Sequence, residues 1–527
     1  MTRDFHVPGR SPVYAGEAMA ATSHPLATLA AIESLRAGGT AADAAVTAVA
    51  TLCVVEPQMT GIGGDCFCLV APPGKPVWGY NGSGRTGAAV RLDALRDLGM
   101  RSIGMDSIHA VTVPGAVEAW NAILQAHGRL GLARALAPAI HYAENGFPVA
   151  PRVNYDWRGA VSRLLANRGA AHQYLVNGRA PEVGDTVRLP ALAATLRAIA
   201  EQGPRGFYEG AVAEDIASTV TANGGVMTID DLAAHRGEAV TPISSNYRGL
   251  DVIEIPPNGQ GLTALVLLNI LERFDLKSLD PLGPDRLHLA LEAARLAFAV
   301  RDTHIAEPSA MRTAVEALLD KAFAEKLAAH IDPARRSALP QAPMPRGDTV
   351  YLTVVDRDRM AVSLINSLYG VFGVGIATEK TGVMLHNRGA CFSLEPDHPN
   401  AIAPRKRPMH TIIPAMAARG GRVEMPFGVM GAHYQPMGHA HVITNMVDYG
   451  MDPQAAIDLP RVFYEGEDTQ VERGIPAATV EELRRRGHTV VVKESPHGGG
   501  QAIRIDWQRG VLTGGSDPRK DGCALGY

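Results

Sequence analysis

The feature that most constrains the fold is a pair of β-branched runs joined by a short charged turn. The first run begins at Thr349, the second ends at Ser367, and the charged residues 356–359 lie between them. Short β-branched runs around a polar turn predict an antiparallel hairpin. If the turn centres on Asp358, Thr349 lies opposite Ser367, and opposed residues have Cβ atoms about 4.5–5.5 Å apart. The pattern therefore predicts two neighbouring hydroxyl groups at the start of the first strand.

Helical patterns dominate the chain before this hairpin. The Ala-rich segments 25–36 and 41–55 predict two helices, and Thr40 is suited to cap the second. Residues 247–257 predict a strand. Residues 332–347 hold four prolines and three arginines with no apolar period, which predicts a mobile loop. Strands and helices alternate after that loop, so we predict one compact α/β unit that is divided there.

Composition and charge narrow the class of protein. The chain has 527 residues, a formal net charge of −4 and five cysteines. No basic patch predicts binding to nucleic acid or to a membrane surface. A sparse, odd set of cysteines is typical of reduced thiols rather than a disulfide framework. The N-terminus lacks the apolar segment of a secretory signal, so we expect a cytoplasmic protein.

Two short motifs resemble metal sites but lack further ligands. Cys66 and Cys68 alternate on a predicted strand, and His439 and His441 lie in a predicted helix. A zinc site needs about four ligands at suitable spacing, so buried thiols and helix packing are the favoured interpretations. The glycine-rich stretch 61–64 matches neither nucleotide-binding pattern. We expect no metal and no cofactor.

A threonine that begins a strand directly after a loop can act on the peptide bond before it. The hydroxyl oxygen of Thr349 can attack the carbonyl carbon of Asp348, and hydrolysis of the resulting ester frees the α-amine of Thr349. An α-amine has a pKa of about 7.7–8.0, which suits a general base near neutral pH. Nucleophile and base then lie in one residue. An Asp-Thr pair before a strand is common, so the pair alone does not identify a cleavage site.

Ordered motifs run from about His24 to Tyr527. They are Pro57-Gln58-Met59-Thr60-Gly61-Ile62-Gly63-Gly64, Thr112-Val113-Pro114-Gly115, Tyr247-Arg248-Gly249, Pro404-Arg405-Lys406-Arg407-Pro408 and Ser516-Asp517-Pro518-Arg519. Together they resemble the gamma-glutamyltransferase family. The resemblance implies an N-terminal-nucleophile hydrolase with an α+β fold, a four-layer αββα sandwich. It also implies a proenzyme that cleaves itself into a large segment, 1–348, and a small segment, 349–527, which stay together as a heterodimer.

The resemblance assigns catalytic roles by position. Thr349 becomes the nucleophile and the new N-terminus, with cleavage between Asp348 and Thr349. Ser367 takes the place of a threonine that hydrogen-bonds the nucleophile's hydroxyl. Gly431 and Ala432 match paired glycines whose backbone N–H groups form an oxyanion hole. An alanine keeps the N–H group but is strained there if its φ angle is positive.

The resemblance also assigns substrate-binding positions, and several of them differ from the family. Arg85 matches an arginine that pairs with the substrate's α-carboxylate, a role that suits a guanidinium. Positions that hold the α-amine of a glutamyl group in the family carry other residues here. These are Tyr369 for an asparagine, Arg388 for a glutamine or glutamate, Cys391 for a carboxylate, and His410-Thr411 for a serine pair.

The altered positions change the expected substrate. An ammonium group beside Arg388 and a neutral Cys391 is poorly paired and costly to bury. The pocket therefore predicts a small amide whose acyl group carries a carboxylate but no α-amine, and the variant resembles oxamate amidohydrolases. Two alternatives stay open. Glu395 or Asp397 can replace the lost acid and restore gamma-glutamyl binding, as for glutathione, or the chain can be an uncleaved, non-catalytic family member.

Overall fold

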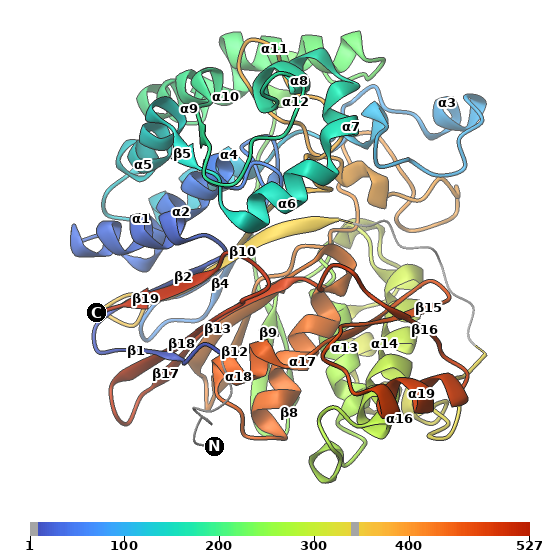
Figure 1. Ribbon diagram of the computed structural model, residues 1–527. Coiled ribbons are helices and arrows are strands. Elements are labelled where there is room, and N and C mark those ends of the chain that lie inside the picture. The colour runs from blue at the N-terminus through green and yellow to red at the C-terminus, as the bar shows by residue number, and fades with distance from the viewer. Residues whose placement is uncertain (1–8, 339–346) are drawn as a thin grey trace.

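The computed structural model describes residues 9–338 and 347–527, which fold into four layers (Figure 1). Two antiparallel sheets stack face to face, and helices cover the outer face of each. Figure 1 shows the larger group of helices above the upper sheet, and α13, α14 and α17 below the lower one. The αββα sandwich that the resemblance implies is therefore confirmed.

The upper sheet contains the predicted hairpin at its centre. Its strands, in spatial order, are β19 (Cys523–Gly526), β2 (Met19–Thr22), β10 (Asp348–Val355), β11 (Ala361–Tyr369), β3 (Asp65–Ala71), β4 (Trp78–Gly82) and β7 (Glu238–Val240). The helices above it include α1 (Pro25–Arg36), α2 (Ala41–Val55), α4 (Ala116–His127), α5 (Leu132–Asn145), α6 (Pro151–Gly159) and α9 (Pro190–Gln202). The two Ala-rich helices are confirmed, and Thr40 caps α2 by accepting from the Asp43 N–H group.

The lower sheet is built mainly from the C-terminal part of the chain. Its strands, in spatial order, are β1 (Val13–Ala15), β18 (Val511–Ser516), β17 (Gly499–Asp506), β13 (Arg422–Met430), β12 (Ala415–Arg419), β9 (Leu250–Glu254) and β8 (Ile243–Tyr247). Its helices include α13 (Gly261–Leu271), α14 (Pro284–His304), α17 (Gln435–Val447) and α18 (Pro453–Asp458). A small sheet, β14 (Val462–Glu465), β15 (Asp468–Val471) and β16 (Thr489–Val492), lies beside α19 (Ala477–Arg485).

The strand predicted over residues 247–257 is confirmed only over Leu250–Glu254, which form β9. The structure forms a hairpin of β8 and β9 that turns at Arg248 and Gly249, whose φ angles are 51° and 83°. Two consecutive residues with positive φ are typical of the tight turn that joins twisted antiparallel strands. The apolar alternation of the second strand hid this turn from the sequence pattern.

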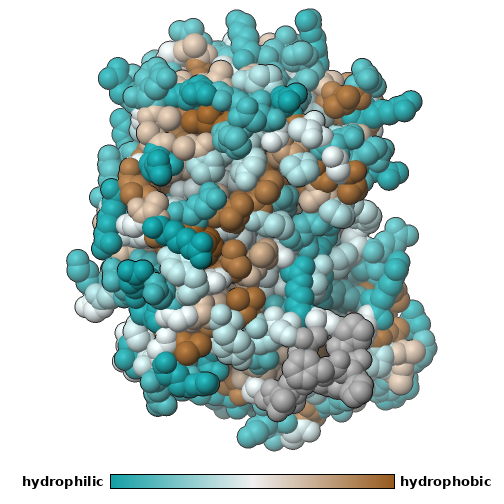
Figure 2. Space-filling view, turned by 60° about the vertical axis from the view of Figure 1, so that its left-hand side comes forward, coloured by the Kyte–Doolittle hydropathy of each residue, from teal (hydrophilic) through white to brown (hydrophobic). Residues whose placement is uncertain are grey.

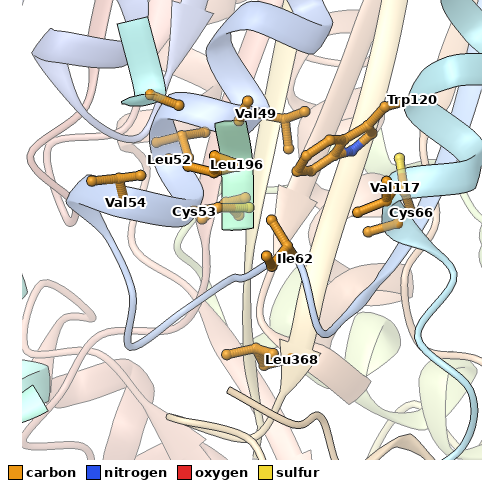
Figure 3. Packing of buried hydrophobic residues seen from close by; sticks show 14 of the residues in the cluster. Val49, Leu52, Cys53, Val54, Ile62, Cys66, Val117, Trp120, Leu196 and Leu368 are labelled. Carbon is orange, nitrogen blue, oxygen red and sulfur yellow. The ribbon is translucent and has the colours of Figure 1, made fainter. Parts of the chain in front are cut away.

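The hydrophobic core has one layer above, one between and one below the sheets. Figure 3 shows part of the upper layer, which includes Val49 and Leu52 of α2 and Trp120 of α4. The middle layer holds side chains such as Tyr351 and Ile365, which are fully buried between the sheets. Alanines along α2 let the helix lie close against its neighbours, and every residue of α2 is buried. The hairpin is therefore packed on both faces.

The hairpin register predicted from the sequence is confirmed. Val350 lies opposite Asn366 and Val355 lies opposite Ala361. An irregularity follows Asp348, whose Cα partner is Tyr369. A register fixed at both ends brings particular side chains together, because a shift of one residue turns each side chain to the other face.

The predicted loop, 332–347, is described only in part, because 339–346 lie outside the described residues. Before that gap, the Asp332 carbonyl lies 2.8 Å from Nε2 of His288, and the Ser337 N–H donates to the Glu292 carboxylate. In the described ranges, no helix is long and apolar enough to cross a membrane. The face in Figure 2 is mainly hydrophilic with scattered apolar residues, as on most globular proteins.

Candidate active site

Thr349 and Ser367 meet at the open end of the hairpin. Thr349 is fully buried near the start of β10, and its Oγ1 lies 3.0 Å from the Oγ of Ser367 on β11. The backbone N–H of Tyr369 donates to the same serine oxygen at 2.8 Å. The serine hydroxyl is thus held in place from its own strand. The pair of hydroxyl groups predicted from the register is confirmed.

Arg388 has a buried guanidinium that is only partly hydrogen-bonded. It belongs to a short 3-10 helix, Arg388–Cys391, and its side chain is fully buried. Nη1 donates to Oγ1 of Thr411 at 2.6 Å, and the guanidinium carbon lies 4.3 Å from the centre of the Tyr369 ring. Nε and Nη2 have no hydrogen-bond partner in the described part of the chain. These two nitrogens form one edge of the guanidinium, which matches the two oxygens of a carboxylate.

Tyr369 forms the floor beneath that guanidinium. Its φ angle is 73°, which is unusual for a bulky residue and indicates a constrained backbone. Its hydroxyl lies 3.0 Å from Nε2 of His433, while Nη1 of Arg301 donates to Nδ1 of that imidazole at 2.8 Å. Because a guanidinium only donates, the proton of His433 is on Nε2 and points at the tyrosine oxygen. Burial and the nearby arginines hold the pKa of His433 well below its ordinary value.

Cys391 and Thr411 complete the surroundings of Tyr369 and Arg388. Burial, together with a hydrogen bond to the Cys391 thiol, raises the pKa of the Tyr369 hydroxyl well above its ordinary value. Thr411 accepts from Arg388 through its hydroxyl, and its backbone carbonyl accepts from Nε2 of Gln260 at 2.8 Å. The structure thus brings together four of the substrate-binding residues predicted from the sequence.

His410, the fifth of those residues, is bound to an acid that the sequence analysis did not select. Its Nε2 lies 3.0 Å from Oδ2 of Asp65, the first residue of β3. The backbone N–H of Ile412 donates to Nδ1 of His410 at 3.3 Å, so Nε2 carries the proton and donates to the carboxylate. Burial and the charge of Arg388 lower the pKa of His410 to about 3. His410 is therefore neutral near pH 7.

Asp65 lies next to the hydroxyl pair, since it faces Ser367 across the β11–β3 ladder. Its Oδ1 accepts from the N–H groups of Gly84 and Gly115 at 3.0 and 3.3 Å. Burial acts to raise the pKa of Asp65, but His386, His410 and Arg388 outweigh it and hold that pKa well below its usual range. Asp65 is therefore an ionised carboxylate in the interior, and it balances the charge of Arg388.

The turn after β13 carries the predicted oxyanion residues. Gly431 has a φ angle of 122° and Ala432 one of 50°. The expected strain at Ala432 is therefore present, because only glycine adopts such angles without cost. Nε2 of Gln260 donates to the Ala432 carbonyl at 2.9 Å as well as to Thr411. The Gln260 amide thus ties this turn to Thr411, whose hydroxyl binds Arg388. The oxyanion role itself stays a prediction.

Arg85 lies in a different setting from Arg388. Its side chain is 37% exposed, forms an ion pair with Glu307 and donates to the Arg405 carbonyl at 3.2 Å. It borders a cavity of about 340 Å³ that His235 also lines. A substrate carboxylate reaching Arg85 has to compete with Glu307, whereas Arg388 offers two nitrogens that have no partner among the described residues. The role of Arg85 in substrate binding stays a prediction.

A large groove opens near the hairpin. It has a volume of about 1760 Å³, and its lining includes Gly347 and Val371. These residues lie two positions before Thr349 and two positions after Tyr369. Further lining comes from α6 and from β15 and β16. Two residues that line the groove are therefore close in sequence to Thr349 and Tyr369.

The other residues that the sequence analysis considered are packed in the core or lie on the surface. Nδ1 of His439 lies 2.7 Å from Oε1 of Glu254, so His439 packs α17 against the lower sheet. Cys66 and Cys68 are buried, and burial raises the pKa of both thiols. Among the described residues, no group of three or more His, Cys, Asp or Glu side chains is arranged to hold a metal ion. Residues 395 and 397, the possible replacement acids, are exposed.

Sequence reasoning missed Asp65, His386 and His433. Asp65 directly follows two glycines and begins an apolar strand, and a charged residue in that place is a usable signal of a buried, hydrogen-bonded carboxylate. His386 and His433 lie close in sequence to the predicted residues Arg388 and Ala432. Neither has a local pattern that separates it from a packed core histidine.

Comparison with known proteins gives a consistent result. The family model described as gamma-glutamyltranspeptidase matches residues 27–527. The chain is 41% identical to the glutathione hydrolase-like YwrD proenzyme of Bacillus subtilis, over 96% of this chain and 98% of that protein. It is 38% identical to the oxamate amidohydrolase proenzyme of Klebsiella pneumoniae, over 97% and 98%. The crystal structure of cephalosporin acylase from Bacillus halodurans superposes with a TM-score of 0.93 at 41% identity, covering 100% of this chain and 99% of that one.

Proposed function

The chain belongs to the gamma-glutamyltranspeptidase family, and from that premise we propose that it hydrolyses the amide of a small acyl group that carries a carboxylate, as in oxamate. Members of this family are N-terminal-nucleophile amidohydrolases or gamma-glutamyl acyltransferases, and so is this protein. The relatives are named proenzymes. We propose that the Asp348–Thr349 bond is cleaved, which gives segments 1–348 and 349–527 of one heterodimer.

One observation carries the choice of substrate. The Nε and Nη2 edge of Arg388 is fully buried and unpartnered in the described residues. Buried N–H groups without an acceptor are costly, and a bidentate carboxylate is the ligand that fits this edge. Tyr369 connects this edge to the nucleophile, because its ring stacks on Arg388 and its N–H binds the hydroxyl of Ser367. A carboxylate on Arg388 therefore leaves a short acyl group facing Thr349.

The site suits a group without an α-amine. An ammonium group needs a carboxylate or several acceptors to replace its hydration. The nearest carboxylate, Asp65, already accepts from two backbone N–H groups and from His410. The other close side chains of the pocket, Cys391 and Thr411, are not carboxylates. Binding a glutamyl α-amine here leaves a buried charge poorly paired beside the Arg388 cation.

The proposed reaction uses the residues in these places. The freed α-amine of Thr349 accepts the proton of its own hydroxyl, and Oγ1 forms a bond to the amide carbon. The N–H groups of Gly431 and Ala432 stabilise the negative charge on the carbonyl oxygen. The C–N bond breaks and the amine leaves with the proton. Water then cleaves the acyl-threonine ester, which releases the acid and restores the hydroxyl group.

A second candidate, a gamma-glutamyl hydrolase or transpeptidase, is favoured by the groove. Oxamate releases only ammonia, which needs little space. A groove of about 1760 Å³ beside Gly347 and Val371 has room for a much larger leaving group or for an amino-acid acceptor. The relative named glutathione hydrolase-like agrees with that candidate.

The test is turnover of oxamate beside glutathione by the purified, processed protein. We expect release of ammonia and oxalate from oxamate, and loss of that activity in Arg388→Gln with processing retained. Cleavage of glutathione alone, with oxamate untouched, would reject the carboxylate-acyl proposal in favour of the second candidate. A protein that stays full-length and turns over neither amide is the non-catalytic family member.

A further inference from the structure

His386 is a buried imidazole with one satisfied nitrogen and one unsatisfied nitrogen. It is fully buried two residues before Arg388. Its Nε2 lies 2.8 Å from the backbone carbonyl of Thr112, and a carbonyl only accepts, so Nε2 carries a proton. Its Nδ1 has no hydrogen-bond partner in the described residues, yet it lies 3.6 Å from Oδ2 of Asp65. In the neutral form, a lone pair therefore points towards a carboxylate.

The charges around His386 nearly cancel before a ligand binds. The groups that face it are the Asp65 carboxylate, the Arg388 guanidinium, the neutral His410 imidazole and the Thr112 carbonyl. Asp65 and Arg388 contribute one negative and one positive charge. Burial, with the cation of Arg388, lowers the pKa of His386 although Asp65 opposes this. The imidazole is therefore neutral near pH 7 in the free enzyme.

A carboxylate on Arg388 upsets this balance. It adds one negative charge to a region that excludes water, and an uncompensated charge in such a region costs several kcal/mol. One added proton restores neutrality. The carboxylate also cancels the cation that keeps His386 neutral, while the attraction of Asp65 remains.

Of the three histidines in contact with Asp65 or Tyr369, His386 alone can take a proton at a nitrogen that has no partner among the described residues. His235 also has an unpartnered Nε2 there, but it lines the cavity beside Arg85. Nδ1 of His410 accepts from the Ile412 N–H group, and Nδ1 of His433 accepts from Arg301. A proton on either of those nitrogens places two donors face to face. A proton on Nδ1 of His386 instead points at Oδ2 of Asp65.

We propose that His386 takes up one proton from solvent when the substrate's carboxylate binds Arg388, and so acts as a positioning residue that completes the charge balance of the pocket. The inference rests on the proposed function, because it needs a carboxylate at Arg388. It goes further by making substrate affinity depend on pH. The added proton strengthens the Asp65–His386 contact and favours the arrangement that holds the acyl group.

The sign of the pH dependence follows from linkage. Binding raises the affinity of His386 for its proton, so binding is tighter at lower pH. The dissociation constant rises about tenfold for each pH unit, for one proton taken up. The dissociation constant changes in this way between the pKa of His386 in the free enzyme and its higher pKa in the complex. Between about pH 5.5 and 7 the carboxyl groups of the ligand stay ionised and the α-amine of Thr349 stays protonated, so neither contributes.

The experiment is titration calorimetry of the processed enzyme with oxalate, in buffers that differ in ionisation enthalpy. We expect uptake of close to one proton per oxalate in the wild type between pH 5.5 and 7, where the α-amine of processed Thr349, with an ordinary pKa of about 7.7–8.0, is already protonated and balances the second carboxylate. His386→Gln keeps a donor for the Thr112 carbonyl but cannot titrate, so uptake falls to near zero and the dissociation constant becomes independent of pH. His386→Asn serves as a second variant. His127→Gln is the control, because His127 also has an unpartnered nitrogen within the described residues but lies on α4, and uptake stays near one.

The outcomes separate this inference from the function on which it rests. Oxalate that binds through Arg388 without proton uptake in the wild type overturns the role of His386 and leaves the proposed function standing. Uptake that persists in both His386 variants also overturns it, since another group then takes the proton. Oxalate that fails to bind, or binds equally well to Arg388→Gln, overturns the proposed function and this inference together.

Discussion

Oγ1 of Thr349 and Oγ of Ser367 lie 3.0 Å apart across the central hairpin of the upper sheet. The same register places Asp65 opposite Ser367 on the next strand. The hydroxyl of the proposed nucleophile, the hydroxyl proposed to support it and a buried carboxylate therefore lie side by side on three adjacent strands. This order depends on strand pairing rather than on flexible loops.

Removing the supporting hydroxyl tests this relationship. Ser367→Ala deletes the bond to Thr349 and leaves the Tyr369 N–H without its acceptor. Loss of one such hydrogen bond costs about 1–3 kcal/mol, so we expect kcat to fall about tenfold to a hundredfold. Ser367→Thr keeps the hydroxyl and retains most of the activity. Steady-state kinetics on the processed proteins measures both, and an Ala variant as fast as the wild type contradicts the role.

Self-cleavage is tested by replacing the nucleophile. Thr349→Ala lacks the hydroxyl that attacks the preceding carbonyl, so we expect one band of 55.8 kDa on a denaturing gel. We expect the wild type to give two bands of about 37 and 19 kDa, in proportion to 348 and 179 residues. Thr349→Ser keeps a hydroxyl and is cleaved. Two bands from the alanine variant rule out Thr349 as the group that cuts the chain.

The charge and the shape of Arg388 have separable effects. Arg388→Lys keeps a cation but loses the paired N–H groups that suit a carboxylate, so we expect kcat/KM for oxamate to fall about tenfold. Arg388→Gln also removes the charge, and we expect a fall of a hundredfold or more, as for hydrogen bonds to charged groups. Arg85→Gln is the informative comparison. A larger loss from Arg85→Gln than from Arg388→Gln places the substrate's carboxylate at Arg85.

The hairpin could be predicted from sequence because its information is local. A charged turn between two β-branched runs fixes the register, and the register alone brings Thr349 to Ser367. The Asp65–His410 bond is different, since 345 residues separate its partners. Gln260 similarly joins Thr411 to Ala432 across the tertiary structure. No spacing or period in the sequence encodes such contacts.

The family resemblance predicted the layers of the fold and the outline of the pocket. The apolar pattern predicted secondary structure less reliably where it was ambiguous. The apolar alternation of β9 hid the turn at Arg248 and Gly249 that joins it to β8. Arg388 was predicted from an altered motif, whereas its unpartnered edge follows only from packing against Tyr369 and Thr411. The sequence can indicate that Asp65 is buried, but that it balances the charge of Arg388 follows only from the three-dimensional structure.

In the turn after β13, Gly431 and Ala432 both have positive φ angles, but the two positions differ in their tolerance to substitution. Ala432→Gly removes the strain at 50° and adds backbone freedom to the unfolded chain, so we expect a net change in stability within about 1 kcal/mol. Gly431→Ala forces a side chain onto a φ of 122°, with its Cβ about 3.0 Å from Cα of Gly498. We expect destabilisation of about 2 kcal/mol or more. Urea unfolding of both variants checks this, and equal effects contradict it.

Glu56, at the end of α2, makes the free energy of unfolding depend on pH. It is buried and accepts from the hydroxyl of Ser23. Burial outweighs that bond and the charge of Lys520, and raises the pKa of Glu56 from 4.5 to about 7. The folded protein therefore holds this proton more tightly than the unfolded chain does. Its contribution is fully present below about pH 4.5 and is lost as the pH rises through about 7.

Glu56→Gln tests that sign, because the amide stays neutral and can still accept from Ser23. We expect the free energy of unfolding of the variant, relative to that of the wild type, to increase by up to about 3 kcal/mol as the pH rises from 5 to 8. Urea midpoints of both proteins at four pH values across this range measure the difference. Glu33→Gln, an exposed position on α1, is the control and should track the wild type at each pH. A constant difference between Glu56→Gln and the wild type shows that the carboxyl does not titrate in this range.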